Sequence, residues 1–288
     1  MDYYSPLRYP GGKGKISSFF AEIFLANNLN NGTYVEPYVG GGSVALYLLF
    51  KGIASHIIIN DKDRSIYAFW HSIINHPEDF CRLVADTPVT METWYRQQDI
   101  QKNKENIDLL SLGFSTFFLN RTNRSGIIKG GVIGGKQQSG KYLMDVRYRS
   151  GELIKRIEKI ANHANQISLY NLDAIELILK LKESLDENTL FYFDPPYYVK
   201  GKGLYMNYYN DQDHQDICSA ISQIKKQKWV VTYDKTDFIH QLYAQHNKMY
   251  EYTLNYSAST IGKGEEFLIV SSNCKLPEHT SIGLREIQ

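Results

Sequence analysis

The sequence has little cysteine, little proline and no excess of either charge. Its 288 residues include 3 cysteines and 8 prolines, and its formal net charge is +1. Cys81, Cys218 and Cys274 are odd in number, far apart and without metal-site spacing, so they indicate neither a disulfide framework nor a metal centre. We expect three buried thiols, for which a reducing cytoplasm is the simplest compartment.

Long hydrophobic runs are also missing. The longest apolar stretches, such as residues 44–50, are too short to span a bilayer, and we expect no secretion signal because the first residues show no basic-then-apolar pattern. With 43% hydrophobic and 22% charged residues, the composition is that of an ordinary soluble protein. The sequence therefore predicts a cytoplasmic protein with no membrane partner, built as one large domain or as a domain with a sizeable insert.

The most informative motif is the tetrad Asp194, Pro195, Pro196 and Tyr197. It follows the apolar run 190–193, which predicts a buried strand, so it lies where open α/β sheets bind ligands. The prolines donate no backbone hydrogen bond and make the turn rigid. A carboxylate, rigid carbonyl acceptors and an aromatic face suit a flat base with an exocyclic amine. An ordinary strand end is the competing interpretation of the tetrad taken alone.

A second motif, residues 34–46, is typical of a strand, a glycine turn and a helix start. Glu36 lies at the end of the strand, Gly40 and Gly42 flank a third glycine, and Ser43 is placed to cap the helix. Such glycines let the backbone approach a ligand that any Cβ would exclude. Because no Gly-Lys-Ser/Thr follows and the G-x-G-x-x-G pattern is not met, a phosphate loop is disfavoured.

Two further segments indicate what the ligand carries. The apolar run 57–59 is followed by Asp61, in the arrangement by which nucleotide-binding sheets hold ribose hydroxyls. Residues 7–13 place Tyr9, a glycine pair and Lys13 together, and Lys13 is suited to pair with a carboxylate. A ligand with a ribose and a carboxylate but no phosphate fits these residues, and S-adenosylmethionine is one.

Taken in chain order, the loop 7–13, the glycine turn with Asp61 and the tetrad 194–197 resemble the motifs of the Dam-like DNA adenine-N6 methyltransferases of the α group. The resemblance extends over about residues 3–272. The resemblance implies that S-adenosylmethionine is the cofactor. Tyr9 stands where well-known members have tryptophan, which keeps a stacking face but loses the indole donor. Asp173 ends a strand where methyltransferases often contact the cofactor adenine. The cofactor-binding residues expected are Tyr9, Lys13, Glu36, Gly40, Gly42, Asp61, Asp173 and Asp194.

The resemblance also implies an α/β fold, a Rossmann-like methyltransferase sheet with an inserted, mainly helical target-recognition domain. We expect the catalytic domain over residues 1–66 and 151–288 and the insert over residues 67–150. Periodicity predicts helices over 64–74, 105–120, 152–166 and 213–228. It predicts strands over 167–173, 190–193, 229–233 and 266–270. Trp94 and Tyr95 are expected to anchor the core of the insert.

A local excess of positive charge lies between residues 121 and 149, where seven cations and six glycines stand against Asp145. Such a loop can follow a phosphate backbone and place guanidinium groups on guanine edges, although a solvated loop is the alternative. Residues 119–127 resemble the family's recognition hairpin, with Arg124 where GATC-specific members have an aromatic wedge, which puts GATC specificity in doubt. Contacts to double-stranded DNA are expected from Arg121, Asn123, Arg124, Lys129, Lys141 and Arg149.

The predicted reaction is methyl transfer to N6 of an adenine flipped out of the duplex, without a metal. Tyr197 would stack on the base, and Asp194 with the Pro195 carbonyl would accept hydrogen bonds from N6. Transfer to cytosine N4 or RNA adenine, and a catalytically silent DNA-binding or regulatory module, are the alternatives. A cognate restriction nuclease or a defence-system component would be a further partner.

Two other segments are interpreted as structural. His214 is preceded by acids that suit the N-terminus of a helix better than a metal site. Residues 263–266 are interpreted as a turn before the last predicted strand. Neither segment is assigned a catalytic role.

Overall fold

The structure is a computed structural model that describes residues 4–8, 13–199, 209–244, 248–256 and 262–287. The chain divides into two compact units, and each is described by itself. The first unit comprises residues 1–12 and 62–171, and the second comprises residues 13–61 and 172–288. The predicted insert over residues 67–150 falls inside the first unit.

The second unit is built on a mixed sheet with the strand order β2-β1-β4-β5-β7-β6-β8. Strand β1 is parallel to β2 and to β4, and β4 is parallel to β5. Strand β7 is antiparallel to its neighbours β5 and β6, and β8 is antiparallel to β6. The bounds are β1 Gly32–Glu36, β2 Ala54–Asn60, β4 Thr189–Phe193, β5 Lys228–Asp234, β6 Lys248–Tyr256, β7 Gly262–Val270 and β8 Leu284–Ile287.

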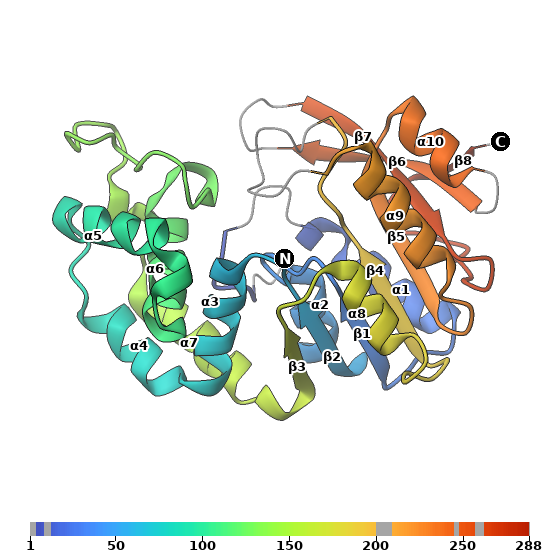
Figure 1. Ribbon diagram of the computed structural model, residues 1–288, viewed down its shortest axis with the longest axis horizontal. Coiled ribbons are helices and arrows are strands. Elements are labelled where there is room, and N and C mark those ends of the chain that lie inside the picture. Colours follow the sequence, from blue (N-terminus) through green and yellow to red (C-terminus); the bar gives the residue numbers. More distant parts are fainter. Residues whose placement is uncertain (1–3, 9–12, 200–208, 245–247, 257–261, 288) are drawn as a thin grey trace. The chain divides into compact units, whose positions relative to one another are not determined.

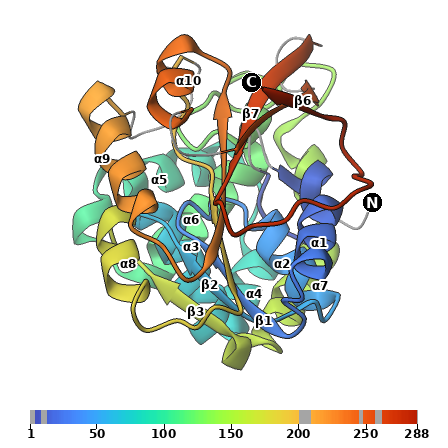
Figure 2. The same cartoon turned by 90° about the vertical axis from the view of Figure 1, so that its right-hand side faces the viewer.

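Helices cover both faces of this sheet, with α1 and α2 on one face and α8 and α9 on the other (Figure 2). Because both faces are covered, all five residues of β4 are buried, and all but Thr189 are apolar or aromatic. The sheet is therefore a central layer between helices, as expected for an α/β fold. The bounds are η1 Lys13–Ile16, α1 Ser17–Ala26, α2 Ser43–Phe50, α8 Ala174–Leu181, α9 Asp211–Ser222 and α10 Asp237–Tyr243.

Four acids lie at or just beyond the ends of parallel strands. Strand β1 ends at Glu36, Asp61 directly follows β2, Asp194 directly follows β4, and β5 ends at Asp234. In the register, Glu36 lies opposite Ile59 of β2. Since parallel strands bring their carboxyl ends to one edge, the sheet collects these acids where α/β folds bind ligands.

The first unit is mainly helical (Figure 1). A cluster of aromatic rings packs its helices together. Phe117 of α6 stacks on Phe69 of α3 and meets Phe80 of α4 edge to face, at centroid distances of 6.2 and 5.6 Å. The bounds are α3 Arg64–Asn75, α4 Pro77–Asp86, α5 Met91–Lys102, η2 Lys104–Asn106, α6 Leu109–Thr122, η3 Arg124–Gly126, η4 Met144–Arg147, α7 Ser150–Ala161, η5 Ala164–Gln166 and β3 Ile167–Tyr170.

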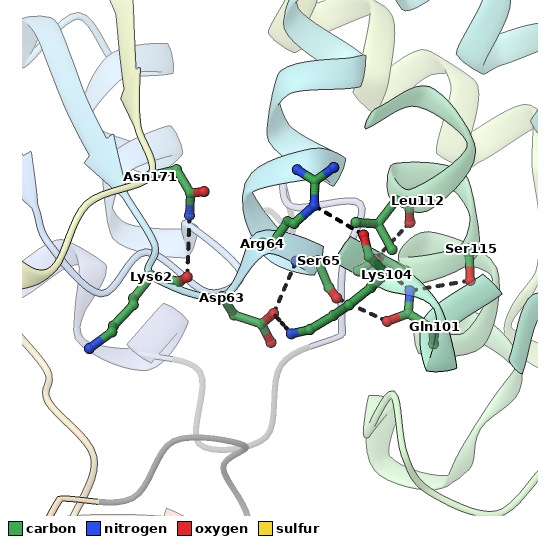
Figure 3. A network of polar contacts seen from close by, with 10 residues as sticks. Lys62, Asp63, Arg64, Ser65, Gln101, Lys104, Leu112, Ser115 and Asn171 are labelled. Carbon is green, nitrogen blue, oxygen red and sulfur yellow. Dashed lines mark hydrogen bonds and ion pairs between the residues drawn. The ribbon is translucent and has the colours of Figure 1, made fainter. Parts of the chain in front are cut away.

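A polar network fixes the start of α3 (Figure 3). The Asp63 carboxylate caps the helix by accepting from the Ser65 amide at 3.0 Å, and it pairs with Lys104 Nζ at 3.0 Å. Arg64 Nε donates to the Lys104 carbonyl at 3.0 Å, and Ser65 Oγ donates to Gln101 Oε1 at 2.9 Å. These contacts explain why the helix predicted from residue 64 begins there.

Several local predictions were wrong. Ser43 is not the cap of α2, because the N-cap is Gly42, whose φ of 60° only glycine adopts easily. Tyr95 is 45% exposed, whereas Trp94 is buried as expected. The helix predicted over 213–228 spans Asp211–Ser222 instead, and Lys228 is the first residue of β5. Of the three thiols, Cys218 and Cys274 are buried and Cys81 is partly exposed.

The turn between β1 and α2 depends on the fully buried Asn60. Its amide Nδ2 donates to the carbonyls of Pro37 and Leu172 at 2.9 and 3.0 Å, and its Oδ1 accepts from the Leu172 amide. Asn60→Ala leaves these groups unsatisfied, so we expect the free energy of unfolding to fall by about 2–4 kcal/mol in urea denaturation. The exposed Asn75, which donates to the His71 carbonyl, gives the control Asn75→Ala. Equal stability of both variants would contradict this role of Asn60.

Candidate active site

The carboxylate of Asp194 is held by one of its two oxygens. Its Oδ1 accepts a hydrogen bond from Thr232 Oγ1 at 2.8 Å and lies 3.4 Å from Lys13 Nζ. Thr232 Oγ1 is in turn 2.9 Å from the hydroxyl of Tyr192. No hydrogen bond or ion pair to Oδ2 occurs within the described part of the chain, and the side chain is 20% exposed. The arrangement leaves Oδ2 as the acceptor available to a ligand.

Lys13 is buried next to the tetrad. Its ammonium donates to Glu266 Oε2 at 2.8 Å and to the hydroxyl of Tyr197, and it lies 5.0 Å from the centre of the Tyr197 ring. The Tyr197 hydroxyl donates to Glu266 Oε1 at 2.7 Å. Glu266, interpreted from the sequence as part of a turn, is instead a fully buried residue of β7. The interpretation of residues 263–266 as a turn was wrong, and the strand predicted over 266–270 is longer than expected, because β7 begins at Gly262, five residues before its apolar run 267–270.

Opposing effects act on the pKa of Asp194. Burial raises the pKa because it disfavours the charged carboxylate, and the negative charge of Glu266 raises it further. The Lys13 ammonium and the hydrogen bond from Thr232 lower the pKa. The net pKa lies above the ordinary value, so Lys13 limits how far burial favours the protonated acid.

Asp234, which no sequence motif indicated, fixes the backbone that follows the tetrad. Its Oδ1 and Oδ2 accept from the amides of Tyr198 and Val199, each at 2.8 Å. The Tyr198 ring stacks on Phe238 at a centroid distance of 4.6 Å. The sequence signal for Asp234 was its position at the end of a strand. Because β4 and β5 are parallel neighbours, the ends of both strands lie at the same edge of the sheet.

The glycine turn places a backbone amide and two acids together. Gly40 and Gly42 have φ of 44° and 60°, and the Gly40 amide donates to Asp61 Oδ2 at 3.0 Å. Glu36 is buried, and its Oε2 has no hydrogen-bond partner among the described residues. Burial, followed by the charge of Asp194, raises the pKa of Glu36 well above its ordinary value. A buried acceptor beside a glycine turn fits a ligand that carries hydroxyl or amino donors.

The remaining predicted cofactor residues have different surroundings. Asp173 caps α8 by accepting from the Ile175 amide at 2.9 Å. Pro195 is buried and Pro196 is partly exposed. Tyr9 lies outside the described residues. The structure therefore brings Lys13 and Asp194 together in one cluster, and Glu36, Gly40 and Asp61 around the adjacent turn.

The predicted DNA-binding residues fall into two groups. Asn123 is fully buried, where its side chain accepts from Trp94 Nε1 at 2.7 Å and donates to the carbonyls of Ile127 and Ile128. Arg121 Nε donates to the Arg147 carbonyl at 2.8 Å, and burial lowers the pKa of its guanidinium to about 9. These two side chains form hydrogen bonds within the first unit. The exposed ones are Arg124, Lys129, Lys141 and Arg149.

His214 is a buried core residue. Its Nδ1 lies 2.9 Å from the Tyr233 hydroxyl, and the helix begins with a capping box formed by Asn210 and Asp213. The described residues contain no cluster of three side chains suited to hold a metal ion. Within the same residues, no helix is long and apolar enough to cross a membrane.

The sequence and the fold were compared with those of known proteins. Residues 9–257 match the family described as D12 class N6 adenine-specific DNA methyltransferase. The chain is 25% identical over 229 residues to the Type II methyltransferase M.MjaIII of Methanocaldococcus jannaschii, covering 73% of this chain and 74% of that protein. The rRNA methyltransferase aviRa of Streptomyces viridochromogenes is 12% identical over 92% of this chain and 87% of its own, with a TM-score of 0.40.

The mixed sheet and the family match together define the chain as an S-adenosylmethionine-dependent methyltransferase with an α/β fold. It belongs to the D12 class N6 adenine-specific DNA methyltransferase family. The chain is therefore a site-specific adenine DNA methyltransferase that acts on DNA with S-adenosylmethionine as cofactor. The predicted family, fold class, enzyme class and cofactor are confirmed.

The Lys13 contact predicts a change in the pH profile. Lys13→Met removes the charge that lowers the pKa of Asp194, so this pKa should rise. If the ionised carboxylate is the active form, transfer is lost as the pH falls through the pKa, and the acid limb moves to higher pH. We expect this movement of the acid limb to higher pH in single-turnover rates measured across the acid and neutral range. The exposed Lys226, paired with Glu183, gives the control Lys226→Met. An unshifted limb in Lys13→Met would contradict the assignment.

Proposed function

We propose that Asp194 and Tyr197 form the methyl-transfer site for an adenine extruded from the DNA duplex. A base inside the duplex hides its exocyclic amine, so extrusion is required at a cost of a few kcal/mol. Asp194 accepts a hydrogen bond from N6 and the Pro195 carbonyl accepts a second. These contacts turn the nitrogen lone pair toward the incoming methyl group, Pro196 keeps the turn rigid, and the Tyr197 ring stacks on the base.

The observation that carries this proposal is the asymmetric environment of the Asp194 carboxylate. Thr232 and Lys13 both approach Oδ1, which orients the group, while Oδ2 has no partner among the described residues. A fixed acceptor aimed at a donor amine stabilises charge that develops during transfer without having to reorganise. No basic side chain need remove the proton before transfer, because the nitrogen–methyl bond forms as the carbon–sulfur bond of the cofactor breaks and the extra N6 proton is then released through the Asp194 carboxylate to solvent.

The cofactor supplies a methyl group activated by a sulfonium. We propose that Asp61 and Glu36 bind donor groups of this cofactor and that the glycine turn lies against it. Asp173 is assigned to the adenine end, and Tyr9 to stacking. Lys13 was expected to pair with the cofactor carboxylate. Its three contacts to Glu266, Tyr197 and Asp194 support an additional role in orienting Asp194.

We assign target recognition to the first unit and its DNA contacts to the exposed cations of residues 121–149. Arg124 is assigned to a base edge, while Lys129, Lys141 and Arg149 are assigned to phosphates. Arg121 and Asn123 act through the shape of the segment, since their polar atoms bind within the unit. The free thiols suit a cytoplasmic enzyme, and the likeness to a Type II methyltransferase suggests a cognate restriction nuclease as partner.

Removing the Asp194 carboxylate tests the site. Asp194→Ala should lower the single-turnover rate by at least about 100-fold, since a positioned polar group contributes about 3 kcal/mol to such a transition state. Cofactor binding measured by calorimetry should remain detectable. Mass spectrometry of the DNA identifies the product as N6-methyladenine, another methylated base or none, which separates the alternatives. Exposed Asp216 provides the control Asp216→Ala, and a rate above a tenth of wild type in Asp194→Ala would refute the role.

The basic segment gives a test of base reading against phosphate binding. Arg124→Ala should lower discrimination between cognate and single-mismatch duplexes by about 1–3 kcal/mol. Lys141→Ala or Arg149→Ala should instead weaken all duplexes alike and reduce the salt slope by about one unit per cation. Methylation rates on matched and mismatched duplexes at two salt concentrations make the comparison. A uniform loss of rate in Arg124→Ala would make Arg124 a phosphate contact, with Lys129 the next candidate reader.

A further inference from the structure

Glu266 is a buried carboxylate that receives three hydrogen bonds. Lys13 Nζ donates to its Oε2 at 2.8 Å and the Tyr197 hydroxyl donates to its Oε1 at 2.7 Å. The hydroxyl of Tyr252, on the neighbouring strand β6, also donates to Oε2. Each oxygen is therefore used by a partner, and the residue is fully buried. A buried charge persists only when paired and hydrogen-bonded in this way.

Two of these partners belong to the methyl-transfer site. The ammonium of Lys13 lies between Glu266 Oε2 and Asp194 Oδ1, at 2.8 and 3.4 Å. The hydroxyl of Tyr197 is the far end of the ring assigned to stacking on adenine. One carboxylate thus restrains both the cation beside the amine acceptor and the direction of the aromatic ring.

We propose that Glu266 is a positioning residue for methyl transfer, which acts through Lys13 and Tyr197 and does not itself touch substrate. The inference rests on the proposed roles of Asp194 and Tyr197. Its physical basis is that transfer depends on alignment of reacting groups, so that a displacement of about 1 Å can cost about 100-fold in rate. A side chain that fixes two members of the site from behind controls that alignment.

The adjacent residue offers a matched control. Glu265 precedes Glu266 on β7, and since successive side chains of a strand point to opposite faces, it projects away from the cluster. Its side chain is 58% exposed and pairs with Lys235 at 3.0 Å. Glu265→Gln and Glu266→Gln are therefore the same chemical change at neighbouring positions of one strand.

The test compares these two variants in the full-length protein. Glu266→Gln keeps the shape but places an amide where donors converge, so the single-turnover rate should fall about 10- to 100-fold. The dissociation constant for S-adenosylmethionine, from calorimetry, should change less than about threefold, because the residue is assigned to alignment and not to cofactor binding. Glu265→Gln should match wild type in both. A rate in Glu266→Gln equal to that of Glu265→Gln would overturn the proposal, as would loss confined to cofactor affinity.

A second variant keeps the test decisive if Glu266→Gln does not fold. Tyr197→Phe retains the ring and removes only the hydroxyl that binds Glu266, and its rate should fall at least about threefold. Where both variants fold, the double variant should lose less than the product of the single losses, since the two groups act as a unit. A wild-type rate in Tyr197→Phe, or independent losses, would overturn the inference. A wild type that makes no N6-methyladenine would overturn the proposed function as well.

Discussion

The buried ammonium of Lys13 is the constraint on which the rest of the site depends. It has acidic neighbours on two sides, Glu266 at 2.8 Å and Asp194 at 3.4 Å. An ammonium removed from water is costly unless such partners surround it, and two buried carboxylates without it would repel each other. The three elements that carry these residues must therefore meet at one place: η1 with Lys13, the end of β4 with Asp194, and β7 with Glu266. The Asp194 carboxylate is oriented as a consequence.

Strand ends could be predicted from the sequence, but partners across the sheet could not. Asp194 and Asp61 follow apolar runs, and the structure places both directly after parallel strands. The roles of Glu266 and Asp234 were not predicted, because each depends on hydrogen bonds to residues far away in the sequence. Glu266 is buried on β7, which lies between β5 and β6. Strand order is a long-range property that local patterns do not carry.

The basic segment shows a similar limit at a smaller scale. Its composition predicted a charged surface, and four of the six assigned side chains are exposed. Composition could not show that Asn123 points inward to Trp94, since that contact joins residues 29 positions apart. Nor could it show that Arg121 is held by backbone carbonyls of the same unit. Residue type predicted the charge of the segment, and packing decided which charges face water.

The separation of Lys13 and Glu266 along the chain, 253 positions, has a consequence during synthesis. A ribosome releases the N-terminal part first, so Lys13 and later the tetrad emerge long before β7 does. Until Glu266 arrives, the ammonium lacks its nearest counter-charge and the Tyr197 hydroxyl lacks its acceptor. The Lys13 ammonium and the Tyr197 hydroxyl therefore reach their shared carboxylate only after β7 has been synthesised and has paired with β6.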